Sequence, residues 1–227
     1  MEQVGVIVVA AGKGLRMGGQ MPKQHLPLAG KPVLVRTLEA FEHMEQIHTV
    51  VLVVGPGDEA RCSRYTSEYG LRKVHAVVTG GAERQASVYQ GLLALDPEVE
   101  WVLVHDGVRP FVTPEETLEC LEAAKRYGAA VVAVPVKDTV KIVEPDGKIA
   151  STPDRSAVWA IQTPQAFRVR ELLAAHEMAM QEGFTGTDDA MVVERTGQPV
   201  YVVRGGYHNL KITTPEDLEW AEYRLKR

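Results

Sequence analysis

The chain is poor in cysteine and aromatic residues, and it has no long apolar run. It contains two cysteines in 227 residues, and aromatic side chains make up 6%. So few cysteines argue against a disulfide-stabilised secreted scaffold, and we expect Cys62 and Cys120 to be reduced and buried. No apolar stretch approaches the roughly 18 residues of a membrane-spanning helix, and no signal-type segment opens the sequence. We therefore expect a cytoplasmic protein that has no membrane partner.

An excess of positive charge is also missing, since the formal net charge is −5 at pH 7. A surface for nucleic acid requires clustered Lys and Arg, so we expect no nucleic-acid partner. The histidines and cysteines show no metal-ligand spacing such as Cys-x-x-Cys, which argues against a zinc site. A polyanionic substrate must then be attracted by a local group of cations.

Apolar β-branched runs alternate with amphipathic segments along most of the chain. We expect strands at 5–10, 49–54, 75–78, 101–105, 130–134 and 200–203. We expect helices at 32–43, 58–68, 83–95, 114–127, 169–182 and 188–194, and a last helix capped at Thr214. Uniformly apolar strands separated by helices predict a Rossmann-like α/β fold, with a mostly parallel sheet and helices on both faces. The length and the lack of a linker favour one domain over residues 1–227.

The helix expected at 114–127 has a clear start and end in the sequence. Thr113 is expected to be its N-cap, and Glu116 stands where a capping box requires an acidic residue. Gly128 is expected to end the same helix.

The alternation of predicted strands and helices is interrupted at about residues 136–157. Residues 138–143 alternate between polar and apolar side chains, which is typical of a strand. Pro145 and Gly147 fit a turn, after which residues 148–151 are expected to form the second strand of a hairpin. An isolated two-stranded hairpin is marginal in water, so this one needs another surface. We expect a protruding β-hairpin arm through which the protein forms a homodimer. A hairpin folded onto its own domain is the alternative.

The first strand runs into a glycine-rich loop that contains Arg16 and ends at Lys23. Glycines let backbone N–H groups approach an anion, and two cations add positive charge. The loop is not a Walker A motif, since Gly19 is followed by Gln20 and not by Lys-Ser/Thr. It is not a dinucleotide-binding motif either, since Met17 stands where the third glycine is required. Fixed cations stabilise the charge that develops during nucleotidyl transfer, so we assign Arg16 and Lys23 to phosphate handling. An ordinary connection with solvated charges is the alternative.

Three further segments carry polar or glycine residues near strand ends. Residues 79–87 place a Gly-Gly turn before a helix, which is a weak signal for nucleotide binding. Asp106 follows a buried strand and suits Mg²⁺ held together with a ribose or phosphate, unless it only caps a turn. Lys211 precedes the last helix, where spacing alone indicates a surface lysine. Ligands bind beyond the carboxyl ends of parallel strands, and that rule gathers three segments at one edge: 11–23, 79–81 and 106–109.

Together these segments resemble the 2-C-methyl-D-erythritol 4-phosphate cytidylyltransferases of the non-mevalonate isoprenoid pathway, which are GT-A-like nucleotidyltransferases. The resemblance lies in A-A-G-x-G-x-R-M with P-K-Q, G-G-x-E-R-x-x-S-V, H-D-x-x-R-P, D-T-V-K, T-P-Q, T-D-D and N-L-K-I-T-T-P-E-D-L. These motifs run in order from residue 10 to residue 218. The resemblance implies that CTP and the polyol phosphate react, with Mg²⁺, to give the CDP-alcohol and pyrophosphate.

The resemblance also implies roles for individual residues. The implied catalytic residues are Arg16, Lys23, Arg155 and Lys211. The implied substrate-binding positions are Ala10, Ala11, Gly12, Gly80, Gly81, Arg84, Ser87, Asp106, Gly107, Arg109, Thr139, Thr163 and Thr187. Asp106 is also the implied Mg²⁺ ligand. Thr139 and Arg155 lie on the arm, which in the family reaches the neighbouring subunit to hold the sugar phosphate.

Two other functions remain open at this point. A ribitol 5-phosphate cytidylyltransferase would share the fold and much of the nucleotide loop. A catalytically inactive nucleotide-binding module is the alternative from another class, and the retention of Arg16, Lys23, Asp106 and Lys211 argues against it. A phosphate monoester has a second pKa near about 6, so it is largely a dianion at neutral pH and attacks without a general base. The sequence offers no obvious base.

Overall fold

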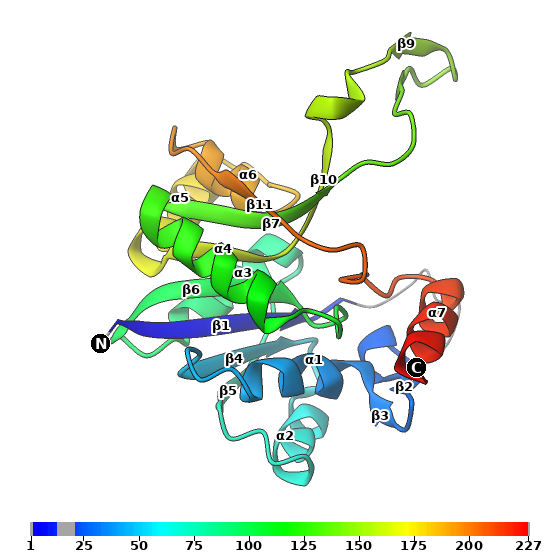
Figure 1. Ribbon diagram of the computed structural model, residues 1–227. Helices are drawn as coiled ribbons and strands as arrows, with labels where there is room; N and C mark the ends of the chain where they lie inside the picture. Colours follow the sequence, from blue (N-terminus) through cyan, green and yellow to red (C-terminus); the bar gives the residue numbers. More distant parts are fainter. Residues whose placement is uncertain (1, 13–20, 227) are drawn as a thin grey trace.

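The computed structural model describes residues 2–12 and 21–226, and Arg16 therefore lies outside the described residues. Within them, seven strands form one sheet in the order β11-β7-β10-β6-β1-β4-β5 (Figure 1). The strands are β1 (Gln3–Ala10), β4 (Thr49–Val54), β5 (Val74–Thr79), β6 (Val99–Asp106), β7 (Ala129–Pro135), β10 (Trp159–Arg168) and β11 (Tyr201–Arg204). The strand pairs are parallel except those of β10, which is antiparallel to β6 and β7. The predicted mostly parallel sheet is confirmed.

Helices cover both faces of this sheet, as the sequence predicts (Figure 1). They are α1 (Val33–Glu42), α2 (Glu59–Glu68), α3 (Arg84–Leu93), α4 (Pro114–Tyr127), α5 (Val169–Gln181), α6 (Asp189–Glu194) and α7 (Pro215–Leu225). Side chains of a strand point alternately to the two faces, so Val6 and Val8 of β1 join one core and Ile7 joins the other. The first core takes side chains from α1, α2 and α4, and the second from α3, α5 and α6. None of the described helices is long and apolar enough to cross a membrane.

The C-terminal helix α7 packs at the carboxyl edge of the sheet, on the right of Figure 1. It lies against the short antiparallel pair β2 (Pro27–Leu28) and β3 (Lys31–Pro32), which follows the 3-10 turn η2 (Lys23–His25). Ile212, just before the helix, is fully buried beside Leu28 and Val108. This small third core holds the segment around residue 211 next to the end of β6.

The ends of α4 agree with the sequence in all but one detail. The Thr113 hydroxyl accepts the Glu116 N–H at 3.2 Å, and Gly128 ends the helix at a φ of 97°. The predicted capping box is wrong, because the Glu116 carboxylate instead accepts the Gly206 N–H at 2.5 Å. A complete capping box is found at α7, where Thr214 caps the helix.

The strand β10 is absent from the strands that the sequence predicts. Its centre carries Gln162, Thr163 and Gln165, which are all buried, although a polar stretch of this kind is typical of a loop. Tertiary partners satisfy these groups: the Asn209 side-chain amide donates to the Thr163 carbonyl at 2.8 Å, and Gln165 donates to Asp188 at 2.9 Å. The polar groups of β10 are thus hydrogen-bonded where periodicity alone would place apolar ones.

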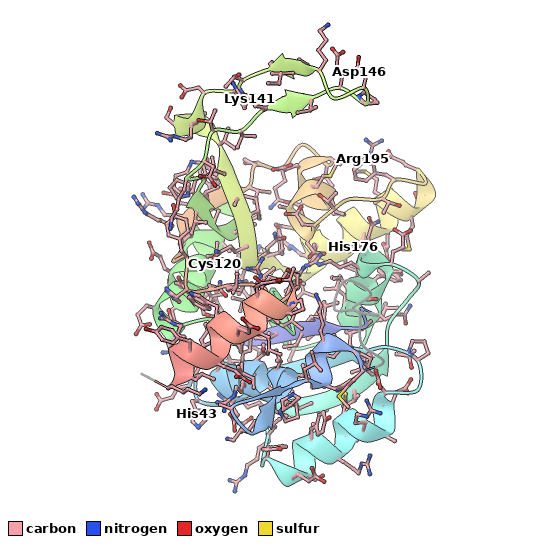
Figure 2. All side chains as sticks on the ribbon, turned by 90° about the vertical axis from the view of Figure 1, so that its right-hand side faces the viewer. His43, Cys120, Lys141, Asp146, His176 and Arg195 are labelled. Carbon is pink, nitrogen blue, oxygen red and sulfur yellow. The ribbon has the colours of Figure 1, made fainter. Side chains whose placement is uncertain are left out.

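The predicted hairpin is present and projects from the body of the protein (Figure 1). It consists of β8 (Ile142–Val143) and β9 (Ile149–Ser151), followed by the 3-10 turn η3 (Arg155–Ala157). Gly147 has a φ of 89°, as the predicted turn requires. Figure 2, which views the carboxyl edge, shows Lys141 and Asp146 on this arm away from the sheet and helices. Ile142, Val143 and Ile149 are more than half exposed, so most of their apolar surface is left uncovered by the described chain.

Candidate active site

A cavity of about 890 Å³ lies at the carboxyl edge of the sheet. Its wall includes the three predicted segments, as far as the structure describes them, together with the segment before α7. The residues that line it include Ala10, Ala11, Gly12, Lys23, Gly80, Gly81, Arg84, Ser87, Asp106 and Lys211. The expectation that strand ends gather these segments is therefore confirmed for the described residues.

The Gly-Gly turn between β5 and α3 has no room for side chains. A Cβ on Gly80 would lie 2.7 Å from Ala11 Cβ, and one on Gly81 would lie 2.4 Å from Ala86 Cβ. The Gly81 N–H donates to the Ser87 hydroxyl at 3.2 Å, and this hydroxyl donates to the Glu83 carbonyl at 2.9 Å. Ser87 is buried, and its hydroxyl fixes the conformation of this turn. Ser87 therefore acts on a bound ligand indirectly, by positioning the Gly80–Gly81 backbone.

Asp106 stands at the end of β6 within a group of three cations. Its Oδ2 lies 2.9 Å from Lys211 Nζ and 3.2 Å from Arg109 Nε, and its Oδ1 lies 3.6 Å from Arg84 Nε. The side chain is 8% exposed. Burial by itself raises the pKa of Asp106, but Lys211, Arg84 and Arg109 outweigh it and hold the pKa well below its usual range. The carboxylate is therefore ionised at neutral pH.

His105 and Thr163 support the Asp106 backbone from inside the protein. The Thr163 hydroxyl accepts the Asp106 N–H at 3.0 Å and lies 3.1 Å from His105 Nδ1. His105 Nε2 lies 3.2 Å from the Arg109 carbonyl, which can only accept, so Nε2 carries the proton and Nδ1 accepts from Thr163. Burial lowers the pKa of His105 to about 4, which keeps this imidazole neutral.

Several residues predicted to line the pocket lie behind it or outside it. Arg109 is buried and donates from Nη1 to the Asn209 carbonyl at 2.8 Å, which braces Asp106. Thr163 is in the protein interior, and Gly107 packs against Ala10 and Leu34. The exposed Thr187 contributes nothing to the cavity wall.

The two predicted arm residues do not line this chain's own cavity. Thr139 and Arg155 are exposed and are absent from the wall. Arg155, in η3, donates from Nη1 to the Lys137 carbonyl at 3.0 Å, which ties the end of the arm to the segment that follows β7. Within one chain, the structure thus does not bring these two residues into the cavity wall that holds Asp106 and Lys211.

Comparison with known proteins gives the family. The family model described as "IspD: 2-C-methyl-D-erythritol 4-phosphate cytidylyltransferase" matches residues 4–227. The chain belongs to this family. The resemblance inferred from the motifs is confirmed.

Relatives in this family match over nearly the whole chain. The 2-C-methyl-D-erythritol 4-phosphate cytidylyltransferase of Geobacillus kaustophilus is 51% identical over 217 residues, covering 95% of this chain and 94% of the relative. The same enzyme of Pelotomaculum thermopropionicum is 49% identical and covers 100% and 95%. The crystal structure of a 4-diphosphocytidyl-2C-methyl-D-erythritol synthase from Anaerococcus prevotii superimposes with a TM-score of 0.88 at 37% identity, covering 100% of this chain and 97% of that one.

For a cytidylyltransferase of this family, Asp106 fits a divalent cation that is shared with a ligand. Among the described residues, no group of three His, Cys, Asp or Glu side chains is placed to hold a metal. Mg²⁺ commonly takes one or two carboxylates together with substrate phosphates and waters. Asp106 Oδ1 makes only the longest of the three contacts of this carboxylate, at 3.6 Å from Arg84 Nε, so it is the oxygen that is less engaged by protein cations.

Sequence reasoning missed two buried residues that stand next to the cavity wall. Asp189 lies 2.6 Å from Arg84, and His176 lies 3.2 Å from Asp189. Asp189 belongs to the T-D-D motif, in which the sequence analysis assigns a substrate-binding role to Thr187 alone. An apolar periodicity gives no reason to select His176 within α5.

Proposed function

We propose that this chain transfers CMP from CTP to 2-C-methyl-D-erythritol 4-phosphate and releases pyrophosphate, giving 4-diphosphocytidyl-2-C-methyl-D-erythritol. The observation that carries this proposal is the cavity at the strand ends, with Asp106 and Lys211 in contact, in a chain whose relatives carry this enzyme's name. A triphosphate and a phosphate monoester need cations close together, and the cavity supplies them.

The nucleotide occupies the glycine-rich part of the wall. Gly80 and Gly81 line the cavity without a side chain, so a ligand can approach their backbone closely. The turn itself requires glycine at both positions, because a Cβ would collide with Ala11 or Ala86. Ala10, Ala11 and Gly12 form the facing wall at the end of β1. Ser87 and Glu83 hold the turn between them in one shape before a ligand arrives.

Lys23 and Lys211 neutralise the phosphates during transfer. Both side chains line the cavity, and Lys211 is 38% exposed, so it can move from Asp106 towards a ligand. We assign Arg16 to the same role on the sequence motif. Mg²⁺ bound by Asp106 and the phosphates would supply further charge neutralisation to the leaving pyrophosphate. Losing one such cationic contact in the transition state typically costs on the order of 10²–10³ in rate.

The acceptor needs no general base in this mechanism. Its phosphate monoester is mostly a dianion at neutral pH, because the second pKa of such esters is near about 6. His105, the residue before Asp106, is not available as a general base. It is fully buried and neutral, and both of its ring nitrogens are hydrogen-bonded, to Thr163 and to the Arg109 carbonyl.

The arm completes the site of a second copy of the chain. The exposed Ile142, Val143 and Ile149 supply an apolar surface for a neighbouring subunit, and a two-stranded hairpin alone is marginally stable. Thr139 and Arg155 would then hold the acceptor phosphate in the partner's cavity. On this proposal the chain is one domain with an arm at about 136–157, working as a homodimer in the cytoplasm.

Purified protein incubated with CTP, Mg²⁺ and either methylerythritol phosphate or ribitol 5-phosphate tests the proposal. Pyrophosphate release with the first acceptor, and at least tenfold less with the second, is the expected result. Faster release with ribitol phosphate would reassign the substrate. Absence of release with both, in a protein that still binds CTP, would indicate an inactive nucleotide-binding module.

A further inference from the structure

Arg84 is shared between two carboxylates that come from different parts of the fold. It is the first residue of α3 and lines the cavity. Its Nη1 lies 2.6 Å from Asp189 Oδ2, whereas its Nε lies 3.6 Å from Asp106 Oδ1. The first distance is that of a charge-assisted hydrogen bond, and the second is too long for one. Asp189 is therefore the stronger partner, although it lies outside the cavity wall.

Asp189 is held rigidly before it meets Arg84. It begins α6 and is 1% exposed, and the next residue, Ala190, donates its N–H to the Gln165 side chain at 3.1 Å. The preceding loop is fixed to α3 because the Gly186 N–H donates to the Gln85 side chain at 2.8 Å. The carboxylate thus has one position relative to the start of α3.

His176 occupies the other oxygen of this carboxylate. Its Nε2 lies 3.2 Å from Asp189 Oδ1, and an ionised carboxylate only accepts, so the imidazole donates from Nε2. His176 is completely buried in the body of the protein (Figure 2), and its Nδ1 has no partner among the described residues. Among the described residues, the ring therefore serves Asp189 at Nε2 alone. Burial raises the pKa of Asp189, but Arg84 and His176 outweigh it and keep the group ionised.

Without the Asp189 charge, the carboxylate that stands in ion-pair distance of Arg84 is that of Asp106, while Asp188 acts on it only from further away. Asp106 already contacts Lys211 and Arg109, and a guanidinium freed from Asp189 would close the present 3.6 Å gap to Oδ1. Arg84 would then leave its place on the cavity wall and cover the carboxylate oxygen that is now least engaged. Both changes weaken a nucleotide site that depends on separated, fixed charges.

We propose that Asp189, backed by His176, is a positioning residue that holds Arg84 on the wall of the nucleotide cavity and away from Asp106. This inference rests on the proposed CTP-dependent function. It assigns no contact between Asp189 and the substrates, so the effect of Asp189 must pass through Arg84.

The test compares Asp189→Asn, Arg84→Gln and the double variant in the full-length protein. CTP binding with Mg²⁺ is measured by calorimetry, and kcat and KM are measured by pyrophosphate release. Asp189→Asn should weaken CTP binding and lower kcat/KM for CTP by about 10- to 100-fold, the range for a lost hydrogen bond to a charged group. The double variant should match Arg84→Gln within about twofold, because there is nothing left for Asp189 to position. Asp189→Glu, which keeps the charge, should recover part of the loss.

Thr113→Ala is the control for the loss of a helix cap, since the Thr113 hydroxyl accepts the Glu116 N–H at 3.2 Å at the start of α4, outside the cavity wall. It should lower the melting temperature and leave CTP binding within about twofold. If Asp189→Asn does not fold, His176→Leu replaces it, with a smaller loss that must also vanish in the Arg84→Gln background. Equal losses in both backgrounds, or CTP binding unchanged in Asp189→Asn, would overturn the inference. Wild-type protein that binds CTP without transferring CMP would refute the proposed function and leave the binding test of Asp189 intact.

Discussion

Asp106 is the counter-ion on which the cation cluster of the site depends, and replacing it by asparagine tests this directly. The substitution keeps the shape of the side chain and removes its charge. It leaves Lys211, Arg109 and Arg84 around a buried neutral amide, where the structure has ion-pair contacts of 2.9, 3.2 and 3.6 Å. Removing one partner of a buried ion pair typically costs about 3–5 kcal/mol, because the remaining charge stays buried without compensation.

For a chain of this length, such a loss corresponds to a fall in melting temperature of about 6–20 °C. Lys211→Gln should cost much less, about 1 kcal/mol or below, because Lys211 is 38% exposed and Asp106 retains Arg109 and Arg84. The double variant should be more stable than Asp106→Asn alone, since one of the uncompensated cations is gone. Thermal and urea unfolding at pH 7 measure all three.

The pH dependence has a definite sign. The pKa of Asp106 in the folded protein is held below its usual value, and the pKa in the unfolded chain is near about 3.9. The carboxylate therefore stabilises the fold fully above that unfolded value, and its contribution is lost as the pH falls below it. The difference in unfolding free energy between wild type and Asp106→Asn should therefore be constant above about pH 5 and shrink steadily as the pH falls below about 3.9. A melting temperature of Asp106→Asn within 2 °C of wild type at pH 7, or a difference that does not shrink in acid, would refute this account of the cluster.

Three further outcomes are expected. With methylerythritol phosphate, kcat should be constant from about pH 7.5 to 9.5, because the acceptor is already a dianion; a slope traced to one ionising side chain would contradict this. Gly81→Ala should lower kcat/KM for CTP by about 10²-fold, since its Cβ would lie 2.4 Å from Ala86 Cβ and displace the turn; an effect below twofold would mean that the turn is not at the nucleotide. Mixing Arg155→Ala with Lys23→Ala chains should restore about a quarter of wild-type activity, because half of the random dimers are mixed and each has one intact site. No recovery would mean that the arm serves its own subunit.

The sequence pattern predicts correctly those helices and strands that are defined by their own residues, through an apolar run or a cap. The strand β4 and the helix α4 have the predicted bounds, since an apolar β-branched run and a clear N-cap with a final glycine define them locally. The strand β10 was missed because its buried glutamines and threonine are satisfied by Asn209, Asp188 and the Ala190 N–H, which are distant in sequence. No local pattern contains that information.

The candidate site divides in the same way. Glycines at the ends of strands predicted the cavity wall, because only a few residue types allow close backbone approach. Lys211 looked like a surface lysine by spacing, and only the fold brings it to 2.9 Å from Asp106. Arg109 was placed in the pocket by motif, but it braces Asp106 from the buried side. Asp189 and His176 contact the site only through Arg84, so a search for residues at strand ends passes over them.

The position of β10 explains why the arm and the site occur at the same edge of the sheet. The strand β7 runs parallel to β6 and ends at Pro135, and β10 returns antiparallel from Trp159, which pairs with Pro135. Both roots of the arm therefore lie at the carboxyl edge, where Asp106 ends β6 and where Thr163 of β10 accepts its N–H. If β10 were a parallel strand, the chain would return at the opposite edge, and the arm could not rise beside the cavity. The antiparallel insertion thus lets one segment brace Asp106 and carry a hairpin outward from the carboxyl edge.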